Sequence, residues 1–185
     1  MEKPSSPSPA PGQIKEFFDQ CCARAHQLLE LKAPRHETLG CLVSAAESIG
    51  GPGTVSSILV VDDEGLLRNG ASPNLPDDYL RAIDRLKPHP RVGTCAAAAA
   101  TGAIVITPDF NADDKWAELR HLPRSLGFFG AWSMPIKASN GRVLGTFGTY
   151  FRERREPTAT EVHHMGILVA IAARVLAGGA ERTEP

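Results

Sequence analysis

The residues best suited to chemistry in this chain lie where a glycine meets a run of small residues. That glycine precedes Thr94 and Cys95, and the alanine run 96–100 follows. The pattern predicts the start of a short helix, with the Thr94 hydroxyl capping free backbone N–H groups. Those groups and the helix dipole attract a small anion or a carbonyl oxygen, and Ala96 and Ala97 leave room for it. The same small residues would also let the helix pack closely on a sheet, so both interpretations stay open.

Cys95 could also act as a nucleophile, because a thiolate is favoured at a helix N-terminus. A catalytic cysteine needs a base that takes its proton, and no histidine lies near Cys95 at a recognisable spacing. Cys41 lies far upstream, so no resolving cysteine is evident either. The sequence therefore favours a packing role for Cys95, and we expect no catalytic residue.

Three aromatic side chains are candidates for the apolar wall of a small-ligand pocket. Trp116 falls in a polar crossing segment, and Trp132 falls in a strand between two small residues. Phe147 and Tyr150 are three positions apart on a later strand, so they face opposite sides of its sheet. Phe147 is the better candidate of the two for the pocket side. Each of these aromatic residues could equally be plain core.

The remaining cysteines and the histidines give only a weak signal for a metal or a haem. Cys21 and Cys22 are adjacent and lack the C-x-x-C spacing of metal ligands, so small packing residues are the simpler interpretation. None of the six histidines forms an H-x-x-x-H pair. His89 and His121 fall in loops that would cover a pocket, and a haem or metal role stays open for them. We expect no metal site and no cofactor.

Composition and charge narrow the class of protein. A chain of 185 residues with 42% hydrophobic and 22% charged residues is typical of one globular domain. A net charge of -1 argues against a nucleic-acid surface, which is usually basic. Four cysteines in a chain of this length indicate a reduced, cytoplasmic setting. No apolar run approaches a membrane span and no signal peptide is visible at the N-terminus, so we expect no membrane partner.

Periodicity predicts an α+β fold with a central antiparallel sheet of about five or six strands flanked by helices. Residues 14–178 form the predicted single domain, with a disordered tail at 1–13 and a frayed tail at 179–185. The expected strands are Val55–Val61, Leu66–Ala71, Ala103–Thr107, Phe128–Ile136 and Arg142–Arg152. Helices are expected over residues 14–29, from near His36 to 49, over Asp77–Leu86, and after a capping box formed by Thr158 and Glu161.

The order of these motifs resembles the GAF domain family, whose members are small-ligand sensory modules of bacterial signalling. The likeness covers roughly residues 35–178. The segments that carry it are Val92–Cys95, Pro108-Asp109, Asp113–Trp116, Gly127, Ala131–Ile136, Asn140-Gly141 and Val143–Tyr150. The chain departs from the family pattern at Ala96, where a second glycine is common, and at Ala131, where relatives often have a cysteine.

The resemblance implies a GAF/PAS-like fold and a stand-alone sensory protein similar to nitrate-sensing GAF proteins. Its small-molecule ligand, for instance an anion such as nitrate, would contact Thr94, Cys95, Ala96, Ala97, Trp116, Trp132 and Phe147. A homodimer formed by the first and last helices would report to a sensor kinase or a transcriptional regulator. Two alternatives stay open: a cysteine-dependent reductase similar to the free methionine sulfoxide reductases that uses Cys95, and a structural dimerisation module.

Overall fold

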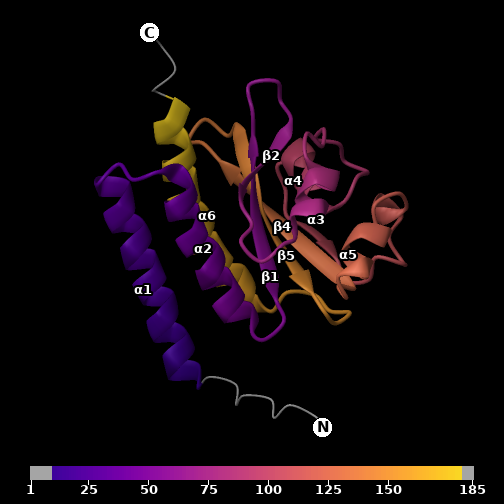
Figure 1. The fold of residues 1–185 in the computed structure, drawn as a ribbon, viewed down its shortest axis with the longest axis horizontal. Coiled ribbons are helices and arrows are strands. Elements are labelled where there is room, and N and C mark those ends of the chain that lie inside the picture. The colour runs from indigo at the N-terminus through magenta and orange to yellow at the C-terminus, as the bar shows by residue number, and fades with distance from the viewer. Residues whose placement is uncertain (1–9, 181–185) are drawn as a thin grey trace.

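The computed structural model of the chain describes residues 10–180, which form one antiparallel sheet between two layers of helices (Figure 1). The helices are α1 (Pro11–Glu30), α2 (Arg35–Gly50), α3 (Asp77–Ile83), α4 (Thr94–Thr101), α5 (His121–Ser125) and α6 (Ala159–Ala180), with a 3-10 turn η1 (Asp114–Trp116). The strands are β1 (Val55–Val61), β2 (Leu67–Ala71), β3 (Val105–Thr107), β4 (Gly130–Lys137) and β5 (Val143–Phe151). The predicted α+β class is therefore confirmed, with five strands.

The strand order across the sheet is β2-β1-β5-β4-β3, and every neighbouring pair is antiparallel. The predicted hairpin turn at Asn140-Gly141 joins β4 to β5, and Gly141 has a φ of 84°, which glycine adopts without strain. Side chains alternate across a strand, so β5 places Phe147 on one face and Tyr150 on the other. The two faces of the sheet consequently build two separate hydrophobic cores.

Three long helices, α1, α2 and α6, cover the face of the sheet that carries Phe147 (Figure 1). α2 and α6 lie against the strands, and α1 packs mainly on α2. Leu39 and Leu42 of α2 and Leu168 of α6 are fully buried at 0% exposure, which explains why these helices dock on the sheet.

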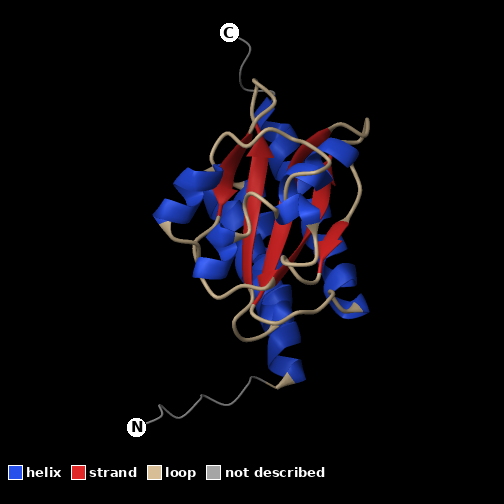
Figure 2. Cartoon of the chain, turned by 90° about the vertical axis from the view of Figure 1, so that its right-hand side faces the viewer, coloured by secondary structure: helices blue, strands red, loops and turns tan. Residues whose placement is uncertain are grey.

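Short helices cover the opposite face, which is turned toward the viewer in Figure 2. α4 packs directly on β4 and β5, whereas α3 and α5 contact each other. Loops connect α3, η1 and α5 to the neighbouring elements. α3 has 7 residues and α5 has 5, and helices of this length are not stable alone. This layer therefore owes its structure to tertiary packing.

Some element boundaries differ from the prediction. The expected tail of residues 1–13 lies partly outside the described residues, and positions 11–13 already belong to α1, which starts at a proline that needs no hydrogen-bond acceptor for its nitrogen. The expected tail at 179–185 also lies mostly outside the described residues, and α6 continues to Ala180. The helix expected over Asp77–Leu86 ends at Ile83, because Leu86 forms a bridge with Leu67 of β2.

Within the described residues one helical segment, Ala159–Gly178 of α6, is long and apolar enough to cross a membrane by length and composition alone. Met165, Leu168 and Ala172 of this helix lie in the core beside α2 and β4, as in the core helix of a soluble protein. Only 39% of its most apolar window is buried within the chain, so an apolar side of α6 stays uncovered.

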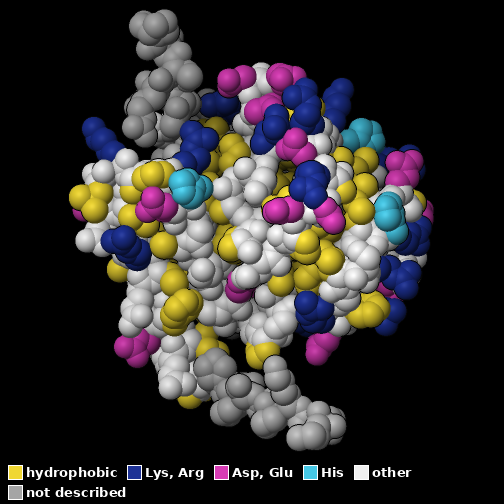
Figure 3. Space-filling model, in the orientation of Figure 1, with side chains coloured by type: hydrophobic (Ala, Val, Ile, Leu, Met, Phe, Trp, Pro, Cys, Tyr) yellow, Lys and Arg dark blue, Asp and Glu magenta, His cyan; other side chains and the backbone are white. Residues whose placement is uncertain are grey.

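Acidic and basic side chains are mixed on the face that Figure 3 shows, and they gather most densely near the tip of the β1–β2 hairpin. There Arg68 contacts both Asp62 and Asp84, and Arg85 contacts Glu64. These exposed pairs contribute little to stability individually. Their mixture leaves no single-sign patch over this hairpin.

An ion pair joins the end of β5 to the start of α6. Arg155 donates to both carboxylate oxygens of Glu161 at 2.8 Å, and its guanidinium carbon lies 3.6 Å from the centroid of the Phe151 ring. Glu161 also accepts from the backbone N–H of Thr158 at 2.7 Å and donates its own N–H to the Thr158 hydroxyl, which confirms the predicted capping box. The Glu161 carboxylate therefore accepts several hydrogen bonds, and only 7% of its side chain is exposed.

We expect Glu161→Gln to destabilise the fold by about 1–3 kcal/mol at neutral pH, because it removes the charged partner of a half-buried arginine. Burial raises the pKa of Glu161, but the bonds from Arg155 and Thr158 outweigh it and hold that pKa below its ordinary value. This stabilisation is present above the unfolded-state pKa of about 4.3 and is lost as the pH falls through the lower folded-state pKa. Urea unfolding at neutral and acid pH measures the difference.

The matched control for this measurement is Glu153→Gln, which changes an exposed glutamate two residues after the end of β5. It should leave stability within about 0.5 kcal/mol of wild type. Equal effects of the two substitutions would contradict the role given to the Arg155–Glu161 pair.

Candidate ligand-binding site

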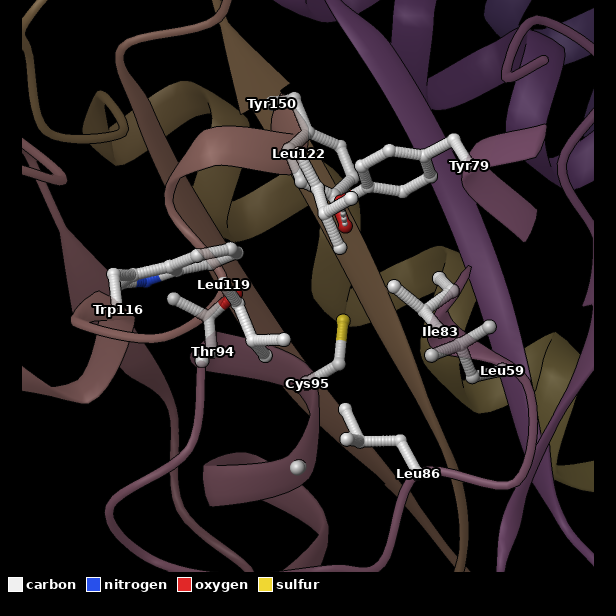
Figure 4. A pocket seen from close by; sticks show the side chains of 12 residues that line it. Leu59, Tyr79, Ile83, Leu86, Thr94, Cys95, Trp116, Leu119, Leu122 and Tyr150 are labelled. Atoms are coloured by element: carbon white, nitrogen blue, oxygen red, sulfur yellow. Dashed lines mark hydrogen bonds between the residues drawn. The ribbon is translucent and has the colours of Figure 1, made fainter. Parts of the chain in front are cut away.

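A small cavity lies between the sheet and the layer of short helices, beside the first turn of α4 (Figure 4). Its apolar lining consists of Leu59, Ile83, Leu86, Ala96, Leu119 and Leu122, and Gly93 completes the backbone side. Its polar lining consists of Tyr79, Thr94, Cys95, Trp116 and Tyr150. About 20 Å³ is open in this conformation, which is little more than a water molecule needs.

The first turn of α4 is fixed to the sheet by a chain of hydrogen bonds centred on Ser133 of β4. The Ser133 hydroxyl donates to the Thr94 hydroxyl at 2.9 Å, and the Cys95 sulfur lies 3.1 Å from the same Ser133 oxygen. Since Ser133 has already used its proton, the Cys95 thiol donates to it. The Thr94 hydroxyl therefore points to the sheet, which corrects the expectation that it caps the helix.

Gly148 of β5 has no side chain, and this lets α4 lie close to the sheet. A side chain at Gly148 would place its Cβ 2.7 Å from the Cys95 sulfur, which is closer than real Cβ atoms approach. Burial raises the pKa of the Cys95 thiol, and the hydroxyls of Ser133, Thr146 and Thr94, which could donate to the thiolate form, offset only part of this effect. Cys95 is consequently a protonated packing group at neutral pH, not a thiolate.

Two tyrosines form one wall of the cavity. The Tyr79 hydroxyl of α3 donates to the Tyr150 hydroxyl of β5 at 2.9 Å, and the rings meet edge to face at 5.9 Å between centroids. Burial raises the pKa of both phenols, so both stay neutral. This bond joins α3 to the central strand β5.

Trp116 of η1 reaches into the cavity from the other side (Figure 4). It is 4% exposed and stacks at a tilt on Phe110, with 4.3 Å between ring centroids. Asp113 fixes this turn, because its carboxylate accepts from the Thr107 hydroxyl at 2.6 Å and from the backbone N–H of Lys115 at 3.0 Å. The indole Nε1 of Trp116 is buried and has no hydrogen-bond partner among the described residues.

Charge is missing from this lining. None of the residues that line the cavity in the described part of the chain is Lys, Arg, His, Asp or Glu. A charged ligand would lose its hydration without gaining an ionic partner, which is unfavourable in an apolar site. The arrangement suits a neutral guest with few polar atoms, and it holds no base beside the thiol.

The structure brings together Thr94, Cys95, Ala96 and Trp116 of the predicted site, and all four line the cavity. Ala97 is buried in the same helix but does not contribute to the lining.

Trp132 and Phe147 lie in the other core, against the long helices, so they do not wall the same hollow as Thr94. This placement corrects the expectation for both aromatic residues. The reason is that side chains alternate between the two faces along each strand. On β4 Ser133, next to Trp132, faces α4, and on β5 Tyr150 rather than Phe147 faces the same side.

Sequence reasoning missed Tyr79, Tyr150, Leu119 and Leu122 as lining residues. Alternation along the strand had already placed Phe147 and Tyr150 on opposite faces. The sequence favoured Phe147 for the pocket side, whereas Tyr150 lines the cavity. Gly148 was the available signal, because a glycine inside a strand often marks close approach of another backbone or helix, and Tyr150 shares its face.

No group of three or more potential metal ligands exists among residues 10–180. Cys21 and Cys22 are half-buried on α1, and burial raises the pKa of Cys22 to about 11. Both are therefore neutral thiols at physiological pH, as expected of packing residues.

Comparison with known proteins agrees with this architecture. The model of the GAF domain matches residues 32–177. The methyl sulfide methyltransferase-associated sensor of Methanosarcina acetivorans is 35% identical over 127 residues, which is 68% of this chain but only 13% of that much longer relative.

Two solved structures illustrate the range of the fold. The GAF domain of a phosphoenolpyruvate-protein phosphotransferase from Coxiella burnetii superposes with a TM-score of 0.70 at 16% identity, covering 90% of this chain and 96% of that one. The free methionine-R-sulfoxide reductase of Neisseria meningitidis superposes with a TM-score of 0.67 at 17% identity, covering 95% of each chain. A domain of a phosphotransferase and a reductase thus share this fold, and the family model shows that the chain belongs to the GAF domain family.

Proposed function

We propose that this GAF domain is a sensory module that binds a small molecule in the cavity between α4 and the short helices α3 and α5. The observation that carries the proposal is the cavity itself: a mostly apolar hollow with a few fixed polar groups, as small-ligand sites have. A homologous region in a protein described as a sensor supports the same role.

The layer formed by α3, η1 and α5 would act as a lid. In the closed conformation about 20 Å³ is free, so any ligand larger than water must displace Leu119 and Leu122. Side-chain packing and a few hydrogen bonds hold this layer to the sheet, among them Tyr79–Tyr150 and Thr107–Asp113. We expect its short helices to be the elements best able to move. Binding would then change how this layer sits on the sheet.

A nitrate-like anion is supported less well than a neutral ligand. It would find backbone N–H groups and the dipole of α4, but no cationic side chain in the lining. An anion held there would bind weakly and without a counter-charge. We therefore keep nitrate and nitrite as test compounds rather than as the favoured ligands.

A reductase function is also supported less well. The Cys95 thiol is buried, has a raised pKa and bonds to a serine rather than to a base. The fold similarity to the sulfoxide reductase carries no residue of that enzyme's chemistry to this chain. We propose that the module binds its ligand without turnover.

The small free volume favours one other function, a structural dimerisation module with a filled core. Such a module would bind nothing in the cavity, and its only activity would be assembly. A ligand screen separates the two functions, because a closed but movable lid admits a guest and a rigid core does not.

Output would pass through the long helices to a sensor kinase or transcriptional regulator in the cytoplasm, where the free cysteines stay reduced. A shallow groove between α1 and α6 is lined by His26, Gly166, Ile167 and Ala170 among others. Ile167 of α6 is 40% exposed and Phe17 of α1 is 44% exposed. Exposed apolar side chains on two adjoining helices suit packing against a second copy of the chain.

The ligand site predicts a sharp effect of Ala96→Leu, which fills the cavity from the first turn of α4. The added volume should cost about 1–3 kcal/mol of stability and block binding. Thermal-shift screening of small metabolites, nitrate and nitrite should give compounds that stabilise the wild type but not this variant.

Ala100→Leu is the matched control, because it makes the same substitution at an exposed position of the same helix. It should retain every stabilising compound. Compounds that stabilise Ala96→Leu as strongly as wild type, or a screen without any hit, would contradict the proposed site.

The dimer predicts that the wild type sediments as a dimer at roughly 10 μM, where weak interfaces are populated. Ile167→Asp places a charge in the proposed interface and should shift the chain to the monomer. Ile104→Asp is the control, because Ile104 is similarly exposed at 44% but precedes the edge strand β3. A monomeric wild type, or a dimer that survives Ile167→Asp, would rule out this interface.

A further inference from the structure

Three of the six histidines lie along the contact between α1 and α6. His26 of α1 and His163 of α6 line the shallow groove between the two helices, and the rings of His163 and His164 lie 5.4 Å apart, edge to face. His164 also meets Phe18 of α1 edge to face, with 4.7 Å between ring centroids. The contact between these helices therefore contains several groups that titrate near neutral pH.

The hydrogen bond of His26 fixes the protonation state of its ring. Nη1 of Arg174 on α6 lies 3.2 Å from Nδ1 of His26. A guanidinium group can only donate, so Nδ1 accepts and the imidazole carries a single proton, on Nε2. A second proton would have to bind Nδ1. It would take the lone pair that Arg174 uses and place a positive charge beside the guanidinium group.

No acidic side chain of the described residues lines the groove to balance such a charge. Its titratable lining consists of Cys22, His26, His163 and Arg174. The acidic residues of the three long helices, none of which lines the groove, are Glu16, Asp19, Glu30, Glu37, Glu47 and Glu161. Their other basic residues are Lys15, Arg24, Arg35, His36 and His164.

The acidic residue nearest to His26 along α1 is Glu30, one turn away and exposed, where an ion pair gains little. A second copy of the chain packed on this groove would bring the same cationic groups, because a two-fold interface repeats each residue. Protonation would therefore add like charges to both sides of the proposed dimer interface.

We propose that protonation of His26 loosens α1 from α6 and weakens the dimer formed through this groove. This inference rests on the dimer of the proposed function and adds its regulation by pH. α1 packs mainly on α2, so its contact with α6 is the smaller of the two and the one that His26 affects. A histidine takes up its second proton near pH 6.5, so the contact is complete above that pH and is lost as the pH falls through it.

Sedimentation of the full chain at about pH 7.5 and about pH 5.5 tests this proposal. The dissociation constant of the dimer should rise by about tenfold or more in acid, since each dimer must keep two copies of His26 singly protonated. Hydrogen exchange, corrected for the intrinsic effect of pH, should show that α1 amides lose protection over this range while α2 amides keep it. Both pH values lie above about 4.3, so the Glu161 carboxylate keeps its charge.

Two substitutions at one exposed position separate charge from contact. His26→Gln keeps an acceptor for Arg174 but cannot be protonated in this range, so its dimer should be insensitive to pH. His26→Lys carries a permanent charge and should behave at about pH 7.5 as the wild type does in acid. His121→Gln is the matched control, because His121 is exposed on α5, and it should retain the pH dependence of the wild type.

The outcomes separate the effect of pH from the dimer itself. An equal dissociation constant at both pH values, or a pH dependence that survives His26→Gln, would overturn the inference and leave the proposed dimer. A wild type that is monomeric at both pH values would contradict the dimer, and hydrogen exchange then decides the role of His26. Protection of α1 that is lost in acid in the wild type but not in His26→Gln would support that role, and any other exchange pattern would overturn it.

Discussion

The contact between Cys95 and the bare backbone of Gly148 is the constraint on which the site depends. With a Cβ only 2.7 Å from the sulfur, no other residue at position 148 would let α4 rest where it does. Ser133 then fixes the angle of the helix by bonding to both Thr94 and Cys95. These contacts fix the floor of the cavity to the sheet, so the proposed ligand entry would require movement of the layer above it.

The sheet separates the layer of short helices from the long helices α1, α2 and α6. Strand β5 contributes side chains to both sides. Tyr150 of β5 faces the cavity, and its neighbour Phe151 faces the long helices and lies under the Arg155 guanidinium. Arg155 in turn binds Glu161 at the start of α6. Adjoining residues and a bidentate ion pair thus connect the cavity wall at Tyr150 to the start of α6.

Local signals in the sequence predicted much of the fold, because they act over a few residues. The Asn140-Gly141 turn and the Thr158–Glu161 capping box both formed as expected. The choice of face was harder. Alternation separates Phe147 from Tyr150 but cannot say which face carries the cavity, since both faces of this sheet are buried.

The part of the cavity lining between η1 and α5 was beyond sequence reasoning for a different reason. Leu119 and Leu122 stand in a polar segment with no clear period, and only their packing above Trp116 gives them a role. The vacant indole N–H likewise depends on every neighbouring group in three dimensions, so no spacing of residues could reveal it.

Native-state hydrogen exchange tests the central claim most directly, because it measures the free energy of opening for each segment. The account predicts that the amides of α3, η1 and α5 exchange through local opening, several kcal/mol below the free energy of global unfolding, while those of β4, β5 and α4 exchange only on global unfolding. Exchange of the short-helix layer at the same free energy as the central strands would contradict a movable lid and would favour a filled, structural core.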